Sequence, residues 1–173
     1  MKKTFIILAF LIGTLVIVKA NEGDTITYRS KSKLEWTDFR MIPDNSDSSR
    51  LSLNLTIVTI TKKVDIWFGI ITVESFAGIL RDSSWVKTEC KTDQLLKYVQ
   101  LKYDIANLYA KKCEKDINRK KINAAFTRKI SKIIDRHINE MKFQLINYDQ
   151  ETDFGNKNEI IDLWVIKLAS GKI

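Results

Sequence analysis

The sequence predicts an α+β fold with a small antiparallel sheet in the N-terminal half, followed by two long helices and a shorter C-terminal helix. β-Branched and aromatic residues are concentrated between residues 25 and 73, as is typical of strands. After residue 93, apolar residues recur every three or four positions, as they do along one face of a helix. Strands first and helices afterwards favour helices packed on one antiparallel sheet.

The first twenty residues are expected to form a signal peptide. Lys2 and Lys3 precede an apolar run, Phe5–Val18, and a cleavage site before Asn21 follows. A run of 14 residues is short for a membrane span, which needs about 20. We therefore expect residues 21–173 to form a single exported domain without a membrane span, in the periplasm or the extracellular space.

Composition favours a globular protein and disfavours a nucleic-acid partner. Hydrophobic residues make up 45% of the chain, which contains four tryptophans. Loss of Lys2, Lys3 and Lys19 with the leader reduces 29 basic residues to 26 against 21 acidic ones, so the formal charge falls from +8 to +5. The densest basic block is Arg119-Lys120-Lys121, so we expect no nucleic-acid binding.

The N-terminal half contains four candidate strands and one loop. Thr25–Ser30 alternates in polarity, and Leu34–Phe39 places Leu34 and Trp36 on one face. Pro43–Arg50 is polar and contains the only proline, which indicates a loop. Beyond it, Leu51–Thr61 and Val64–Val73 are predicted to pair as a hairpin that turns at Lys62-Lys63.

The C-terminal half contains three candidate helices. The first spans about Asp93 to Asn118, with either Asp93 or Thr92 as its N-cap. The second spans about Lys121 to Asn147, and the third, after a turn at Gly155, about Asn158 to Leu168.

The two cysteines are expected to be unpaired. Cys90 precedes the first helix and Cys113 lies near its far end, about 20 helical residues or 30 Å away. A disulfide requires Cα atoms within about 7 Å of each other.

The segment Gln94–Ala110 resembles the active helix of a bacterial family of secreted zinc proteases. Where the family has Leu-Leu-x-His-Glu-Gln-Gly-His-Phe-Asp-Ile-Ala-x-x-Tyr-Ala, this chain reads Leu-Leu-Lys-Tyr-Val-Gln-Leu-Lys-Tyr-Asp-Ile-Ala-Asn-Leu-Tyr-Ala. Tyr148–Gly155 is similar to a second family segment, Tyr-Asp-x-Glu-Thr-x-His-Gly, and Trp164 follows it at the family's spacing. Leu34–Phe39 and Ser84–Lys87 also resemble the family framework. The resemblance implies a zincin-like domain.

The metal ligands of that family are absent at the matching positions. The family helix carries His-Glu-x-x-His, in which two imidazoles one turn apart bind zinc and the glutamate activates a water. This chain has Tyr98, Val99 and Lys102 there, and Phe154 where the third histidine stands. Its single histidine, His137, cannot restore a two-histidine site. The resemblance therefore implies a degenerate member that has lost its zinc and its general base, a pseudo-protease without a cofactor.

Two residues each allow two interpretations. The Lys102 ammonium either stands where the zinc was and pairs with Glu151 or Asp153, or extends to water along its helix. His137 lies on the apolar face of the second helix. It is either a buried histidine with a local hydrogen bond or a residual ligand together with Glu140.

From the resemblance we expect a non-catalytic binding or scaffold protein of the cell envelope, which holds an unknown protein or peptide in the former substrate cleft. The residues expected in that cleft are Tyr98, Lys102, Glu151, Asp153 and Phe154. One alternative is an active hydrolase with an atypical site that uses Glu151, Asp153 and Asp104. Another is an envelope-anchored structural protein, if the leader is retained.

Overall fold

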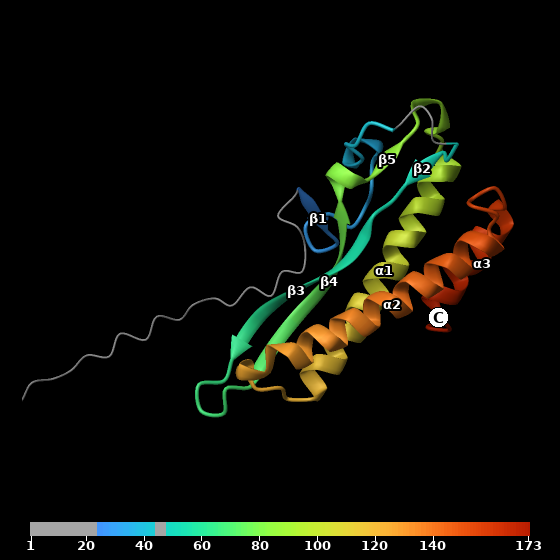
Figure 1. Ribbon diagram of the computed structural model, residues 1–173. Helices are drawn as coiled ribbons and strands as arrows, with labels where there is room; N and C mark the ends of the chain where they lie inside the picture. Colours follow the sequence, from blue (N-terminus) through green and yellow to red (C-terminus); the bar gives the residue numbers. More distant parts are fainter. Residues whose placement is uncertain (1–23, 44–47) are drawn as a thin grey trace, which may run out of the picture.

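The computed structural model describes residues 24–43 and 48–173. The strands are β1 (Thr25–Thr27), β2 (Leu51–Ser52), β3 (Leu55–Val64), β4 (Ile71–Leu80) and β5 (Trp85–Val86), and the helices are α1 (Asp93–Arg119), α2 (Thr127–Glu151) and α3 (Asn158–Ala169). The expected order, with strands first, then two long helices and a shorter one, is confirmed (Figure 1). The predicted signal peptide, residues 1–20, and residues 44–47 of the predicted loop lie outside the described residues.

The described strands form two antiparallel sheets where the sequence predicted one. The larger has the order β1-β4-β3, and the smaller pairs β2 with β5. Helix α1 packs against β3 and β4 and also contacts α2 and α3, so it lies between the larger sheet and the other helices (Figure 1). Because neighbours cover α1 on several sides, its buried residues extend well beyond one stripe.

A hairpin forms as predicted, but its turn and its second strand lie further along the chain. The second strand, β4, spans Ile71–Leu80 instead of Val64–Val73, and the predicted turn at Lys62-Lys63 is wrong. β3 continues through both lysines, and the register between Thr61↔Val73 and Lys63↔Thr72 leaves Lys62 as the extra residue of a β-bulge. The chain turns between Asp65 and Ile70. There the Asp65 carboxylate accepts hydrogen bonds from the amides of Trp67 and Phe68, both at 2.9 Å.

Two further strand predictions are corrected. Leu51–Thr61 is split into β2 and β3, because the Asn54 amide donates to the Ser84 hydroxyl at 3.0 Å instead of continuing a ladder. Leu34–Phe39 contains a 3₁₀ turn at Trp36–Asp38 instead of a strand. A capping box forms this turn: the Asp38 carboxylate accepts from the Glu35 amide at 2.8 Å, and Glu35 caps reciprocally.

The boundaries of α1 and α3 agree with the prediction to within one residue, whereas α2 both starts and ends later than predicted, and its end is at Glu151 instead of about Asn147. Thr92 is the N-cap of α1, since its hydroxyl accepts from the Leu95 amide at 3.2 Å. α2 begins at Thr127 rather than near Lys121, because Asn123 first caps a 3₁₀ turn.

Both cysteines are free, as predicted, and burial raises the pKa of the Cys113 thiol to about 12.

Side chains of α1 complete the hydrogen bonding of β4. β1 pairs with the last residues of β4 only, at Gly78, Ile79 and Leu80. Along the remainder, the amides of Val73, Ser75 and Ala77 donate to Asn118, Glu114 and Asn107 of α1, at 2.8, 2.9 and 3.3 Å. Alternate residues of a strand thus bind polar residues on one face of a helix, which fixes α1 relative to the sheet.

Candidate functional site

The candidate site is centred on three polar side chains of α1 and α2. The Tyr98 hydroxyl donates a short hydrogen bond to Oδ1 of Asp149, and the Lys102 ammonium lies 2.8 Å from Oδ2 of the same carboxylate. Tyr98 and Lys102 are one helical turn apart, so their side chains leave the same face of α1. Only 12% of the Lys102 side chain and 19% of the Asp149 side chain are exposed. The carboxylate is therefore neutralised inside the protein.

Aromatic packing fixes Tyr98 in this position. Its ring stacks on Tyr148 at a centroid distance of 5.2 Å, and Tyr148 meets the edge of Trp164 at 5.1 Å. Burial, followed by the hydrogen bond to Asp149, raises the pKa of Tyr98 far above its usual value. The phenol thus stays protonated and acts as a hydrogen-bond donor to Asp149, not as a phenolate metal ligand.

A tight turn after α2 forms one side of the site. Asp153, Phe154 and Gly155 all have positive φ, at 50°, 51° and 89°. A Cβ atom at Gly155 would lie 2.8 Å from Cγ of Tyr98, so glycine permits the turn to approach the ring. Gln94 of α1 holds this turn through a 3.0 Å hydrogen bond to the Gly155 carbonyl.

A cleft of about 470 Å³ opens above the three polar side chains. Its walls come from the chain around β2, from α1, from the last turns of α2 and from the turn after α2. The lining residues are Ser48, Ser49, Arg50, Leu51, Leu53, Tyr98, Lys102, Asp149, Phe154 and Asn156. Arg50 donates to the Phe154 carbonyl at 2.6 Å and so joins the two opposite walls. The lining is mixed, with leucines beside charged groups, as in many ligand clefts.

Three of the five residues expected in the cleft line it, namely Tyr98, Lys102 and Phe154. Glu151 is outside the lining: it accepts from the Trp164 indole at 2.8 Å and pairs with Lys167 at 3.3 Å. Asp153 is also outside and accepts from Asn156 at 3.1 Å.

Lys102 has a carboxylate partner, but the expected partners Glu151 and Asp153 are corrected to Asp149. Sequence reasoning missed this residue, although it stands in the segment that resembles the family, directly after Tyr148. Asp149 was overlooked because it matches a residue of the family's framework, not one of the residues that bind zinc in the family. Arg50 was missed because it was assigned to a loop without a partner.

Val99 does not face the cleft. Its side chain is fully buried in the core on another side of α1. Asp104, proposed for an atypical site, lies elsewhere: it accepts from Tyr28 at 3.1 Å and from Gln100 at 2.8 Å. Burial raises the pKa of Asp104. The three carboxylates of the hydrolase alternative thus each have separate partners.

His137 of α2 faces Asp116 of α1. Only 6% of its surface is exposed, as expected of a buried histidine. Nε2 is 3.4 Å from the Asp116 carboxylate and 3.1 Å from the Arg136 guanidinium. Nδ1 is 3.0 Å from Glu140 without the alignment of a hydrogen bond. His137 therefore has the contact with Glu140 that a residual metal-ligand pair requires. However, the Arg136 guanidinium places a positive charge beside Nε2.

The residues at the positions of the family's zinc ligands do not fit zinc. Structural and catalytic zinc sites use imidazole, thiolate and carboxylate donors. Here the three ligand positions hold a protonated phenol, an ammonium and a phenylalanine, and the position of the general base holds a buried valine. The nearby Asp149 carboxylate is already bound to the phenol and the ammonium. In the described parts of the chain, no three His, Cys, Asp or Glu residues lie close enough together to hold a metal ion. Likewise, none of the described helices is long and apolar enough to cross a membrane.

Comparison of the chain with protein-family models, with curated proteins and with solved structures finds no match in any of the three.

Proposed function

We propose that this protein is a non-catalytic, exported binding protein of the cell envelope, with a zincin-like fold whose former metal site is closed by an ion pair. The observation that carries the proposal is the contact of Lys102 with Asp149 at the floor of the cleft. A cation held by a buried carboxylate repels a second cation from the same place. The side chains that remain there hold each other and do not activate a water.

The ligand we propose for the cleft is an extended peptide segment of an envelope protein. β2 forms part of the wall, and in the smaller sheet it pairs with β5 alone, so among the described strands its other edge has no partner. Such an edge binds an extended chain through main-chain hydrogen bonds. Leu51 and Leu53 on the same wall offer apolar contacts to alternate side chains of that chain.

Photo-crosslinking tests the binding role. A photoreactive amino acid replaces Phe154, whose side chain is 59% exposed at the cleft. The matched control replaces Ile166, which is 63% exposed on α3. Irradiation with envelope extract is expected to give a discrete adduct from position 154 and none from position 166. Equal adducts from both positions, or none from position 154, would contradict the proposal.

Peptide turnover separates the proposal from the hydrolase alternative. We expect no cleavage of casein or of a fluorogenic peptide library by the purified protein. Turnover that a chelator abolishes, and that a charge change at Lys102 alters, would replace the binding role with a hydrolase.

A further inference from the structure

A second feature lies at the end of the molecule where β3 turns into β4. Three consecutive residues of this turn are almost fully exposed: Ile66 at 86%, Trp67 at 84% and Phe68 at 72%. We call these three residues the apolar tip. Figure 1 shows that the turn projects beyond the neighbouring ends of the helices. Adjacent large apolar side chains that are exposed together mark an interaction surface.

The tip is held in place by its own hydrogen bonds and by the connection between α1 and α2. Asp65 caps the turn, and hydrogen bonds from the Phe68 and Trp67 amides hold the pKa of its carboxyl below the usual range. Asn123 donates to the Phe68 carbonyl at 2.7 Å, and the Ala124 amide donates to the Gly69 carbonyl at 2.8 Å. These hydrogen bonds fix the backbone of the turn in the conformation that exposes the three apolar side chains.

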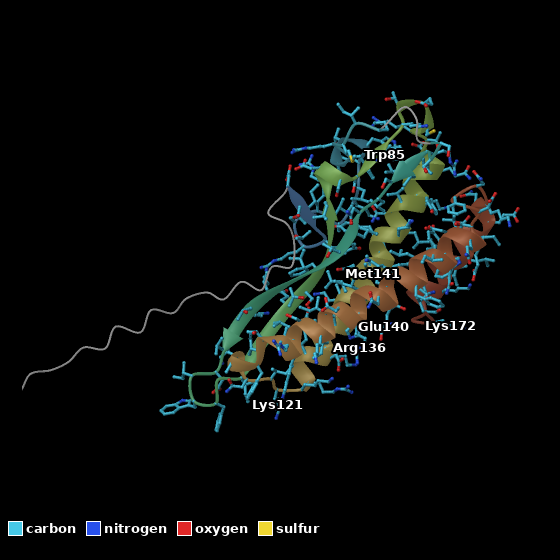
Figure 2. All side chains as sticks on the ribbon, in the orientation of Figure 1. Trp85, Lys121, Arg136, Glu140, Met141 and Lys172 are labelled. Atoms are coloured by element: carbon cyan, nitrogen blue, oxygen red, sulfur yellow. The ribbon has the colours of Figure 1, made fainter. Side chains whose placement is uncertain are left out.

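Basic residues lie at the same end of the molecule as the tip. The connection to which it is bound borders a hollow of about 610 Å³ whose lining includes five basic residues, Lys120, Lys121, Lys129, Lys132 and Arg136. Figure 2 labels Lys121 at this end of the molecule. Lys62 and Lys63 add charge from the end of β3 and are exposed.

Much of this charge is not neutralised within the protein. Lys120 and Arg136 contact Asp116. Among the described residues, Lys121 and Lys132 have no ion-pair partner, and both are exposed. Lys129 lies 4.7 Å from the centre of the Phe126 ring, which is itself 54% exposed and continues the apolar surface toward the hollow.

We propose that this surface docks onto an anionic phospholipid bilayer: the apolar tip enters the headgroup region while the surrounding lysines contact lipid phosphates. Tryptophan and phenylalanine are suited to the membrane interface, and basic residues attract anionic lipids. A second copy of the chain does not fit, because the lysines of two such surfaces would repel. A nucleic acid would use the rings of Trp67 and Phe68 but leave the aliphatic Ile66 exposed. The inference does not depend on what the cleft binds.

Vesicle co-sedimentation tests the proposal on the purified protein in the form in which the cell processes it. Vesicles of phosphatidylglycerol and phosphatidylcholine in equal parts are compared with pure phosphatidylcholine. We expect binding to the anionic vesicles only, and weaker binding as salt is added. The fluorescence of Trp67 should shift to the blue on binding, while Trp85 and Trp164 are already buried and Trp36 is half-buried against the core. The variant Trp67→Phe should keep binding but lose the shift.

Two pairs of variants locate the surface. Trp67→Ser with Phe68→Ser should weaken vesicle binding at least about tenfold. Its control, Leu163→Ser with Ile166→Ser, changes exposed apolar residues of α3 and should bind like the unchanged protein. Lys121→Glu with Lys132→Glu should weaken binding at least about 25-fold, since each basic residue near a membrane contributes about fivefold. Its control is Lys172→Glu, which Figure 2 shows at the other side of the molecule.

All of these residues are exposed, so the variants should keep the fold, and circular dichroism of each variant checks this. No binding of the unchanged protein to anionic vesicles overturns the proposal, as does equal binding by the tip variant. Preferential binding to a single-stranded oligonucleotide also overturns it and identifies the surface as a nucleic-acid site.

Discussion

Asp149 is the residue on which the candidate site depends. It accepts a hydrogen bond from Tyr98 and an ion pair from Lys102, and these contacts join α1 to α2. The sequence left two interpretations of Lys102 open, a pair with a carboxylate or an extension to water, and the structure shows the pair. The identity of its partner was not predictable, because it depends on how α2 crosses α1, and no local pattern encodes that crossing.

Replacing Lys102 alone should destabilise the protein more than replacing Lys102 and Asp149 together. Lys102→Met leaves the Asp149 carboxylate mostly buried with one donor, so we expect a loss of about 2 kcal/mol in the free energy of unfolding. In Lys102→Met with Asp149→Asn no charge remains, and about half of that loss should be recovered. Urea unfolding of the unchanged protein, the single variant and the double variant measures these free energies.

The exposed pair of Lys97 and Asp162 is the matched control, because it also joins α1 to a later helix. Lys97→Met should cost less than about 0.5 kcal/mol. Equal losses from Lys97→Met and Lys102→Met would show that the ion pair at the cleft floor contributes nothing special.

Asp116 provides a second, pH-dependent contact between α1 and α2. Burial acts to raise the pKa of this carboxyl, but hydrogen bonds from Arg136 and His137 outweigh it and lower the pKa below the usual 3.8. The folded protein therefore binds the Asp116 proton less tightly than the unfolded chain does. The stability that Asp116 contributes is present above about pH 4 and is lost as the pH falls through the lowered value.

Asp116→Asn should reduce the free energy of unfolding by about 1–2 kcal/mol at neutral pH. The difference from the unchanged protein should shrink steadily once the pH falls below the usual carboxyl pKa. Urea unfolding at a series of pH values measures it. A difference that stays constant at every pH would contradict the ionic role of Asp116.

Among the elements, α1 and β4 depend on each other most. Asn118 accepts from the Val73 amide and donates to the Val73 carbonyl at 2.9 Å, which replaces a neighbouring strand at that residue. The sequence indicated the helix and the strand separately. It did not indicate that polar residues of one would satisfy the backbone of the other, because Asn107, Glu114 and Asn118 resemble an ordinary solvated helix face.

Asn118→Ala should cost about 2 kcal/mol, because it leaves two backbone groups of Val73 without partners. Asn107→Ala should cost about half as much, since Asn107 accepts a single, longer hydrogen bond from Ala77. Asn139→Ala, on the exposed side of α2, is the control and should have little effect. Thermal unfolding ranks the three, and an Asn118→Ala variant as stable as the control would refute this role of α1.

The elements predicted best are those in which local chemistry agrees with the final packing. α3 was placed within one residue because its sequence is apolar between a turn and the C-terminal glycine. The β3–β4 turn was misplaced because two lysines resemble a break in a strand. The true turn depends on Asp65 and on Gly69, whose φ of 64° and close approach to Asn123 are fixed by the α1–α2 connection.

For the whole molecule, two distinct surface regions lie at opposite ends. The cleft at one end contains a neutralised ion pair, whereas the apolar tip lies at the other end beside a hollow lined by five basic residues. The net charge of the chain did not predict the basic surface near the tip. The basic residues are interspersed along the sequence and come together only where the α1–α2 connection meets the β3–β4 turn.

We propose that the ion pair of Lys102 and Asp149 occupies the position of the family's zinc, and zinc analysis of the purified protein is the decisive test. Metal content is measured by mass spectrometry after dialysis against zinc-containing buffer and then against buffer without zinc. We predict well below one equivalent of zinc per chain, because Lys102 and the protonated Tyr98 supply no zinc donor and Asp149 is already bound. One tightly held equivalent, lost when Asp149 is replaced by Asn, would contradict the account.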